Sequence, residues 1–256
     1  MRKARRSTQV GLLALCVCLA AAGVALGERV QAGNLIVDVD GGFSPSKLPK
    51  KKPAPITLKA SADISTADGK VPPPLQQLIL NFDRNGSVQT KGLPVCTAGQ
   101  LENTTSPVAR KKCKSSIVGT GSASALIAFP DQPPLPASSP LTIFNGPKVG
   151  GNPSVIIHAY LTIPAPTTFV IPSPITRATG RYRYRVVSNI PPIAGGYGSL
   201  THFDIKIHKV WKVKGERVSY ASARCSDGRL QASGQFTFGD GTVMSGSVFR
   251  PCKSTG

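Results

Sequence analysis

The sequence predicts an all-β protein: a single antiparallel β-sandwich of about ten strands, with a distorted barrel as the alternative. Three observations carry this prediction. The 256 residues include 26 glycines and 23 prolines, which suit short strands joined by tight turns better than helices. Several segments alternate apolar and polar residues with a period of two, as a strand with one face on a core does. Four cysteines beyond the N-terminal segment indicate disulfides that would staple such a fold.

The N-terminus has the parts of a secretory signal peptide. Four of the first six residues are arginine or lysine, an apolar stretch follows at 10–26, and short residues lie at Val30-Gln31-Ala32. We predict a signal peptide over residues 1–32, with cleavage after Ala32 as the first choice and after Gly27 as the second. The alternative is an uncleaved membrane anchor, although the apolar run is close to the lower limit of about 17 residues for crossing a bilayer. The protein is therefore expected to be secreted, either extracellular or in the cell envelope.

The formal net charge of the chain is +19. Without residues 1–32 the chain keeps 26 cations and 11 anions, a formal charge of +15. Such an excess favours anionic partners, here an anionic cell-wall polymer or another acidic surface. Because the chain is predicted to be exported, no nucleic acid partner is expected. The alternative is that the charge only keeps the protein soluble.

Residues 33–55 are predicted to form a basic extended segment, because prolines and lysines dominate its second half. The β-sandwich domain is then expected over residues 56–256. Its first strand is clear, since Ile56, Leu58 and Ala60 alternate with polar residues.

The remaining strands follow from the same alternation or from runs of β-branched and aromatic residues. Including the first, they are expected at 56–65, 78–82, 117–129, 141–144, 154–163, 168–171, 181–187, 201–213, 217–224, 230–238 and 242–249. Asp83-Arg84-Asn85-Gly86 is a strong hairpin signal, and the proline-rich stretch 130–140 is expected to be a loop. The last three strands are expected to form a meander.

Two of these strands have clearly separated faces. In 154–163, every second residue from Val155 to Ile163 is apolar or small and shares one face. In 201–213, Phe203, Ile205 and Ile207 are in phase. We expect both sets to point into the core.

The segment between Cys96 and Cys113 is predicted to contain one or two short helical turns. Thr97 and Gln100 have the spacing of a capping box, and Ser106-Pro107 is a second helix start. Four cysteines allow three pairings. We favour Cys96–Cys113, which would close this insert with a stabilisation of roughly 3 kcal/mol, and Cys225–Cys252, which would pin the C-terminal segment.

The sequence predicts no catalytic, metal or cofactor site. It contains no Gly-x-Ser-x-Gly elbow, no phosphate-binding glycine loop and no Cys-x-x-Cys. His202 and Asp204 lie two residues apart on one strand, so a base and its orienting carboxylate could share that face. A strand surface also carries such a pair without any catalytic role.

Basic residues form two stripes that we predict to bind anions. The first stripe is Arg181, Arg183 and Arg185, and the second is Lys206, His208, Lys212 and Lys214. If the two strands are neighbours, their faces would merge into one cationic surface. The alternative for each stripe is a solvated sheet face. Tyr182 and Tyr184 are expected to point into the core.

Several short motifs lie within about residues 75–252: KGLPVC at 91–96, Cys113, VGTG at 118–121, FNG at 144–146 and the final cysteine pair. In these motifs the chain resembles a family of exported β proteins of high-GC Gram-positive bacteria, whose function is not established. The resemblance implies a secreted β protein and assigns no activity or site residue.

These observations favour a non-catalytic secreted or envelope-associated module that contacts anionic polymers through its cationic surface. Two alternatives remain open. The first is an extracellular hydrolase whose site is assembled from distant residues around His158, His202 and Asp204. The second is a subunit that binds a protein partner through an exposed apolar patch or an unpaired strand edge.

Overall fold

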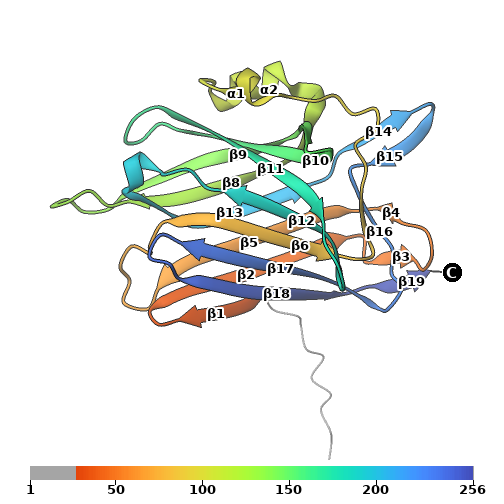
Figure 1. The fold of residues 1–256 in the computed structure, drawn as a ribbon, viewed down its shortest axis with the longest axis horizontal. Helices are drawn as coiled ribbons and strands as arrows, with labels where there is room; N and C mark the ends of the chain where they lie inside the picture. Colours follow the sequence, from red (N-terminus) through yellow and green to blue (C-terminus); the bar gives the residue numbers. More distant parts are fainter. Residues whose placement is uncertain (1–26, 256) are drawn as a thin grey trace, which may run out of the picture.

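The computed structural model describes residues 27–255, so the predicted signal peptide lies outside the described residues up to position 26. The described chain forms nineteen strands, two short α-helices and two 3-10 turns (Figure 1). In chain order the elements are β1 (Glu28–Ala32), β2 (Leu35–Ser44), β3 (Lys47–Pro49), β4 (Ala54–Pro55), β5 (Thr57–Thr66), β6 (Leu75–Asp83), β7 (Gly86–Val88), α1 (Ala98–Leu101), α2 (Ser106–Lys112), η1 (Lys114–Ser116), β8 (Ile117–Ile127), β9 (Leu135–Val149), β10 (Asn152–Leu161), β11 (Thr167–Arg177), β12 (Tyr182–Asn189), η2 (Ala194–Gly196), β13 (Gly198–Ile207), β14 (Val210–Val213), β15 (Glu216–Ser219), β16 (Ala221–Ala223), β17 (Arg229–Phe238), β18 (Val243–Pro251) and β19 (Lys253–Thr255).

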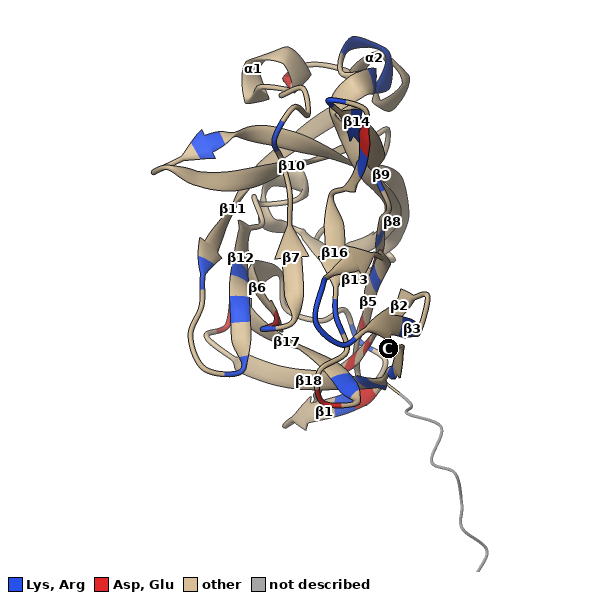
Figure 2. Cartoon of the chain, turned by 90° about the vertical axis from the view of Figure 1, so that its right-hand side faces the viewer, with Lys and Arg blue, Asp and Glu red and all other residues tan. Residues whose placement is uncertain are grey.

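Twelve strands form one antiparallel sheet in the order β1-β2-β5-β13-β8-β9-β10-β11-β12-β6-β17-β18. The sheet curls until its last strand, β18, packs against its first two, β1 and β2 (Figure 2). A Cβ placed on Gly246 of β18 would lie 3.2 Å from Val30 and 3.3 Å from Val39. The backbone N–H of Ser247 donates to the carboxylate of Glu28. The all-β prediction is therefore confirmed, and the sheet is nearly closed into a barrel-like form.

The alternation of side chains decides what fills this barrel-like sheet. On β10, Val155, Ile157, Ala159 and Leu161 face the interior, as the period-two pattern predicts. Phe203, Ile205 and Ile207 of β13 also face the interior. The expected continuation of the first face to Ile163 is wrong, because β10 ends at Leu161 and Ile163 is exposed.

A second, three-stranded sheet in the order β4-β16-β7 covers one end of the barrel-like sheet, and we call it the end cover. Figure 2 looks at the molecule from this end, with β7 and β16 lying across the opening. Val88 and Ala221 of the end cover pack against the inward-facing side chains. Away from the cover the interior is filled by a cluster that includes Leu75, Phe236 and Phe238.

The helical insert, residues 97–116, lies over the outer faces of β9 and β10 at the top of Figure 1. The predicted disulfide Cys96–Cys113 is formed, and so is Cys225–Cys252. The capping box is present, with the Thr97 N–H donating to the side-chain oxygen of Gln100 at 2.9 Å. Between residues 27 and 255 no helix has the length and apolar character to cross a membrane.

The predicted start of the folded domain at residue 56 is wrong. Residues 28–32 form β1 and residues 35–44 form β2, which pairs with β5 along ten register positions from Leu35↔Thr66 to Ser44↔Thr57. Only the lysines and prolines after Phe43 belong to short connecting elements. Val30 and Ala32 alternate with Arg29 and Gln31, so the strand pattern was present before the predicted cleavage position.

One predicted hairpin turn and the predicted C-terminal meander are also wrong. Asp83-Arg84-Asn85-Gly86 does not join a hairpin, since β6 pairs with β12 and β17 while β7 pairs with β16. Residues 217–224 form two short strands, β15 and β16, outside the twelve-stranded sheet. Of the predicted meander only the hairpin β17–β18 is formed.

The proline-rich stretch 130–140 is only partly a loop, because β9 begins at Leu135 and includes Pro136 and Pro140. This half of β9 pairs with β8 alone, whereas the pairing with β10 starts at Thr142. A proline lacks an N–H to donate and is tolerated where a strand has one unpaired edge. The predicted strand 201–213 is divided in the structure into β13 and β14.

Gly121 of β8 is required by the close approach of β13. A Cβ at this position would overlap the carbonyl oxygen of Asp204, and one at Gly119 would contact the carbonyl oxygen of Lys206 at 2.5 Å. Glycine in a strand interior often marks such a close approach of backbones.

Candidate functional site

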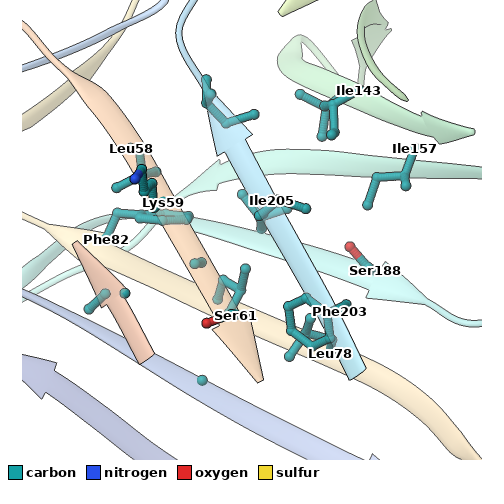
Figure 3. A pocket seen from close by; sticks show the side chains of 18 of the residues that line it. Leu58, Lys59, Ser61, Leu78, Phe82, Ile143, Ile157, Ser188, Phe203 and Ile205 are labelled. Carbon is teal, nitrogen blue, oxygen red and sulfur yellow. The ribbon is translucent and has the colours of Figure 1, made fainter. Parts of the chain in front are cut away.

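A cavity of about 290 Å³ lies inside the barrel-like sheet, just below the range of about 300–1,000 Å³ that is usual for small-molecule sites. Its lining is almost entirely apolar and comes from both walls and from the end cover. Figure 3 shows the side chains of Leu78, Phe203, Ile205, Ile143 and Ile157 gathered around this space. The strands that carry them are β6, β9, β10 and β13, which come from three separate parts of the sequence.

The cavity exists because small residues stand at several inward positions. Ala123, Ala159, Ala221, Ala232 and Gly234 all line it. About eight strands make a barrel that side chains can fill, whereas larger barrels enclose cavities. Twelve strands with small inward residues therefore leave a space at the centre of the sheet.

Several apolar side chains that face the cavity are only half-buried. Leu58, Leu80, Ile157 and Ile205 belong to this group although each lies on an inward strand face. A close-packed core would bury such residues completely. The interior therefore keeps an accessible apolar surface.

Two buried serines along the cavity have protein partners. Ser188 lies 2.7 Å from the hydroxyl of Ser173. Ser139 accepts a hydrogen bond from the backbone N–H of Tyr160 at 2.8 Å. Tyr220 differs from them, because its hydroxyl is buried and makes no hydrogen bond with any described residue. Burial raises the pKa of Tyr220 well above its ordinary value, so its phenol stays protonated.

The cavity reaches the seam, by which we mean the junction of β18 with β1 and β2. Val39, Gly41 and Gly42 of β2 line the cavity together with Val248 and Arg250 of β18. The pairings of the described strands include no ladder between β18 and β2, so side chains close the sheet here. Arg250 forms an ion pair with Asp40 across this junction.

The two basic stripes predicted to form one anion-binding surface are not brought together. β12, which carries Arg183 and Arg185, and β13, which carries Lys206, are separated in the sheet by β8, β9, β10 and β11. The condition for a merged surface is therefore not met, and anion binding by each stripe stays a prediction. The order of strands in a sheet depends on contacts between distant segments, which alternation does not encode.

The residues of the first stripe differ in their contacts. Arg181 and Arg185 are exposed, and the Nε–H of Arg185 donates to the side-chain oxygen of Asn81 at 3.0 Å. The guanidinium of Arg183 lies 5.6 Å from the ring centre of Tyr184, which is buried as predicted.

The second stripe is also divided. Lys206 lies on β13 and His208 directly follows it, whereas Lys212 and Lys214 belong to the separate hairpin β14–β15. All four side chains are exposed.

The residues of the hydrolase hypothesis do not form one site. His202 lies on the outer face of β13, with its Nδ1 2.7 Å from Asp63 and its Nε2 3.9 Å from Asp204. His158 lies on β10, which β8 and β9 separate from β13 in the sheet, and is fully buried beneath the helical insert. No cavity among those described joins the two histidines, so the predicted assembly is wrong.

His158 is a structural residue of the insert. Its Nε2 lies 3.1 Å from both the hydroxyl and the carbonyl oxygen of Thr104. Burial lowers the pKa of His158, and the nearby positive charge of Arg110 lowers it further. The neutral imidazole therefore connects the insert to β10.

A smaller polar pocket of about 240 Å³ lies where β6 ends. The carboxylate of Asp83 accepts hydrogen bonds from the N–H groups of Asn85 at 2.7 Å and Gln231 at 3.0 Å. Burial raises the pKa of Asp83. Arg84 pairs with Asp227 at 3.2 Å. These contacts hold the turn that directs the chain from β6 into the end cover.

Sequence reasoning missed the cavity, although it identified many of the inward faces. The available signal was the number of alternating segments together with small residues at 123, 125, 159 and 232.

In residues 27–255 no group of three histidine, cysteine or acidic side chains is placed to hold a metal ion. No family model, no curated protein and no solved structure matches this chain.

Proposed function

We propose that this protein binds a small apolar molecule inside the barrel-like sheet. The observation that carries the proposal is the cavity of about 290 Å³ with its almost wholly apolar lining. An apolar cavity of this kind holds little water, and the free energy decreases when an apolar ligand fills it. A ligand with one hydrocarbon chain of moderate length is the class that such a space favours.

Binding is favoured over catalysis by the chemistry of the lining. The residues around the cavity include no histidine and no cysteine, and the paired donors and acceptors described above are engaged in structural hydrogen bonds. A nucleophile needs an adjacent base within hydrogen-bond reach. The lining instead has the features of a carrier or storage site.

The proposal is tested by titrating the purified protein with N-phenyl-1-naphthylamine, an apolar fluorophore, and displacing it with decane or dodecane. The matched variants are Ala123→Leu and Thr120→Leu, both on β8. Ala123 lines the cavity, whereas Thr120 is exposed on the outer face. We expect Ala123→Leu to weaken binding at least about tenfold, because an added side chain occupies the ligand space.

Thr120→Leu is expected to bind the fluorophore as the unaltered protein does. Absence of binding to the unaltered protein would contradict the proposal, and so would equal affinity of the two variants.

We propose that this binding takes place outside the cytoplasm. The two disulfides support such a location, since disulfides persist in oxidising compartments. The predicted signal peptide supports it as well, with cleavage after Gly27, the second choice, because β1 begins at Glu28 and is part of the fold. The resemblance to exported proteins also supports it. Fractionation of the producing cells, with detection of the protein in medium and envelope, tests this location.

A second candidate function is attachment to an anionic envelope polymer. The observation that favours it is a basic region formed by α2, η1 and the hairpin β14–β15, in the upper part of Figure 2. Its exposed cations form no ion pair within the described residues; they are Arg110, Lys111, Lys112, Lys114, Lys212 and Lys214. Arginine and lysine near a polyanion bind in a salt-dependent way.

This second candidate is tested by co-sedimentation with cell walls, with and without their anionic polymers, over a range of salt concentrations. The charge reversal Lys111→Glu with Lys112→Glu is expected to reduce binding at low salt. Arg181→Glu with Arg185→Glu, outside this region, serves as the matched control. Binding that is insensitive to salt and to both reversals would contradict the candidate.

A further inference from the structure

We infer that Tyr220 is the polar anchor of the cavity and donates a hydrogen bond to an oxygen atom of the bound ligand. This inference rests on the proposed function, binding of an apolar molecule, and narrows the class of ligand. The ligand would be a neutral hydrocarbon that carries one acceptor oxygen, such as a ketone or an ester carbonyl.

The backbone of Tyr220 is held in place from two sides. Tyr220 connects β15 to β16, and its N–H donates to the carbonyl oxygen of Lys209 at 2.9 Å. Its own carbonyl oxygen accepts from the N–H of Gln89 at 3.0 Å. The side chain is 4% exposed and packs in the cluster that includes Ile143 and Tyr184. A ring fixed in this way presents its hydroxyl at a defined position.

The hydroxyl of Tyr220 is the one buried side-chain polar atom of the lining that has no partner among the described residues. Two other buried atoms of the described chain lack a partner, Ser106 Oγ and His158 Nδ1, and neither residue lines the cavity. Buried polar groups are nearly always hydrogen-bonded, and an exception calls for a reason. A ligand acceptor in the adjacent cavity supplies one, once the side chains that cover the hydroxyl move aside.

The surroundings of Tyr220 define the charge of the ligand. The cluster around the ring consists of aliphatic side chains with Tyr184 and the partly buried Trp211. The two cations of the cavity lining, Lys59 and Arg250, lie outside this cluster, so a carboxylate beside Tyr220 would lose its hydration without gaining a counter-ion. Because burial raises the pKa of Tyr220, the phenol remains a donor at neutral pH. A neutral acceptor therefore suits the site better than an acid.

The test compares two probes of equal chain length, dodecane and 2-dodecanone, as competitors of N-phenyl-1-naphthylamine. Each is measured with the unaltered protein and with Tyr220→Phe. For each protein we take the ratio of the dissociation constants of the two probes. The solubility of each probe is the same in both experiments, so it cancels when this ratio is compared between the two proteins. We expect this ratio to shift by about 3- to 10-fold against the ketone in Tyr220→Phe, which corresponds to one neutral hydrogen bond.

Tyr160→Phe is the matched control. Tyr160 follows Ala159 on β10 and is absent from the lining of the cavity. The same substitution there should leave the ratio unchanged. The melting temperature of Tyr220→Phe should also be no lower than that of the unaltered protein, since the substitution removes a hydroxyl that has no partner in the described chain.

A second readout needs no variant. 2-Dodecanone labelled with ¹³C at its carbonyl is bound to the unaltered protein, and its infrared carbonyl band is compared with the band in hexane. A hydrogen bond from Tyr220 lowers the frequency of the band, and the shift should be absent with Tyr220→Phe.

The outcomes separate the two proposals. If neither probe displaces the fluorophore from the unaltered protein, the cavity does not bind apolar molecules and both proposals fail. A different result is that both probes bind, that their ratio is the same in Tyr220→Phe, and that the carbonyl band stays at its hexane position. This result overturns the role of Tyr220, while the binding function stands. A lowered band that persists in Tyr220→Phe assigns the hydrogen bond to another donor and equally overturns the inference.

Discussion

Asp40 of β2 and Arg250 of β18 form an ion pair across the seam, where the pairings of the described strands include no ladder. The Arg250 side chain is 20% exposed and that of Asp40 is 62% exposed. The guanidinium also donates to the carbonyl oxygen of Phe249 at 2.9 Å, which fixes its direction. This ion pair, the Glu28–Ser247 contact and the packing of Val30 and Val39 beside Gly246 therefore join strands that backbone hydrogen bonds join elsewhere in the sheet.

Asp40→Asn should loosen the seam with little effect on the rest of the fold. Pairs of this exposure contribute about 0.2–1 kcal/mol, so a small decrease in melting temperature is expected. Hydrogen exchange of β18 should become faster, as measured by mass spectrometry on its peptides. Asp68→Asn is the control, since Asp68 pairs with Lys70 within its own turn. Unchanged protection of β18 in Asp40→Asn would contradict this role of the pair.

His158 should make the stability of the protein depend on pH. Burial lowers its pKa in the folded state, so the unfolded chain takes up a proton first as the pH falls. The free energy of unfolding should therefore decrease as the pH falls from about 6.5, the ordinary pKa of histidine, to the lowered pKa of the folded state. Urea unfolding at pH 7.5 and pH 5 measures this decrease.

In His158→Gln the decrease between these two pH values should be smaller. His208→Gln, which changes an exposed histidine, is the control and should retain the full decrease. Equal pH dependence in the His158 variant and the unaltered protein would rule out this assignment.

Removal of the disulfide Cys96–Cys113 should destabilise the insert and spare the cavity. The link closes a loop of 17 residues, for which a loss of roughly 3 kcal/mol is expected. The insert packs on Phe144 and Ile156, which lie on the outer faces of β9 and β10 and do not line the cavity. We expect Cys96→Ala with Cys113→Ala to unfold at lower urea concentration and still to bind N-phenyl-1-naphthylamine. Loss of fluorophore binding under folding conditions would show that the insert supports the cavity.

Gly121→Ala should be strongly destabilising for its size. The added methyl group would overlap the carbonyl oxygen of Asp204 on β13, so β8 and β13 would have to separate. Overpacking of this kind costs typically about 1–3 kcal/mol. Gly99→Ala, in α1, is the control because no atom lies within 4 Å of the added Cβ. Thermal unfolding that is equally unaffected by both substitutions would contradict the close approach of these strands.

Local pattern allowed the strand content, the helical insert, both disulfides and several inward faces to be predicted from the sequence. The faces of β10 and β13 followed from alternation because burial on one side imposes a period of two. The insert followed from the Thr97–Gln100 spacing. Both signals lie within a few residues of the structure that they predict.

Non-local pairing could not be predicted in this way. The Asn85-Gly86 signal was overridden because Asn85 is buried in a network that includes Asp227 and Arg224, from a distant segment. The separation of Arg185 and Lys206 follows from the order of strands, and so does the cavity. A cavity is a property of the closed sheet, which no single segment shows.

The closure of the sheet has a consequence for the timing of folding. Glu28 and Ser247, which meet at the seam, are 219 positions apart in the chain. A ribosome or a secretion channel releases the first of these residues long before the second. The outer edge of the β1–β2 pair therefore stays uncovered until β18 emerges. Contacts of such long range form slowly, and uncovered edges attract other chains in the meantime. The yield of folded protein should therefore depend on how quickly the C-terminal hairpin is released and on how well the early strands are kept apart.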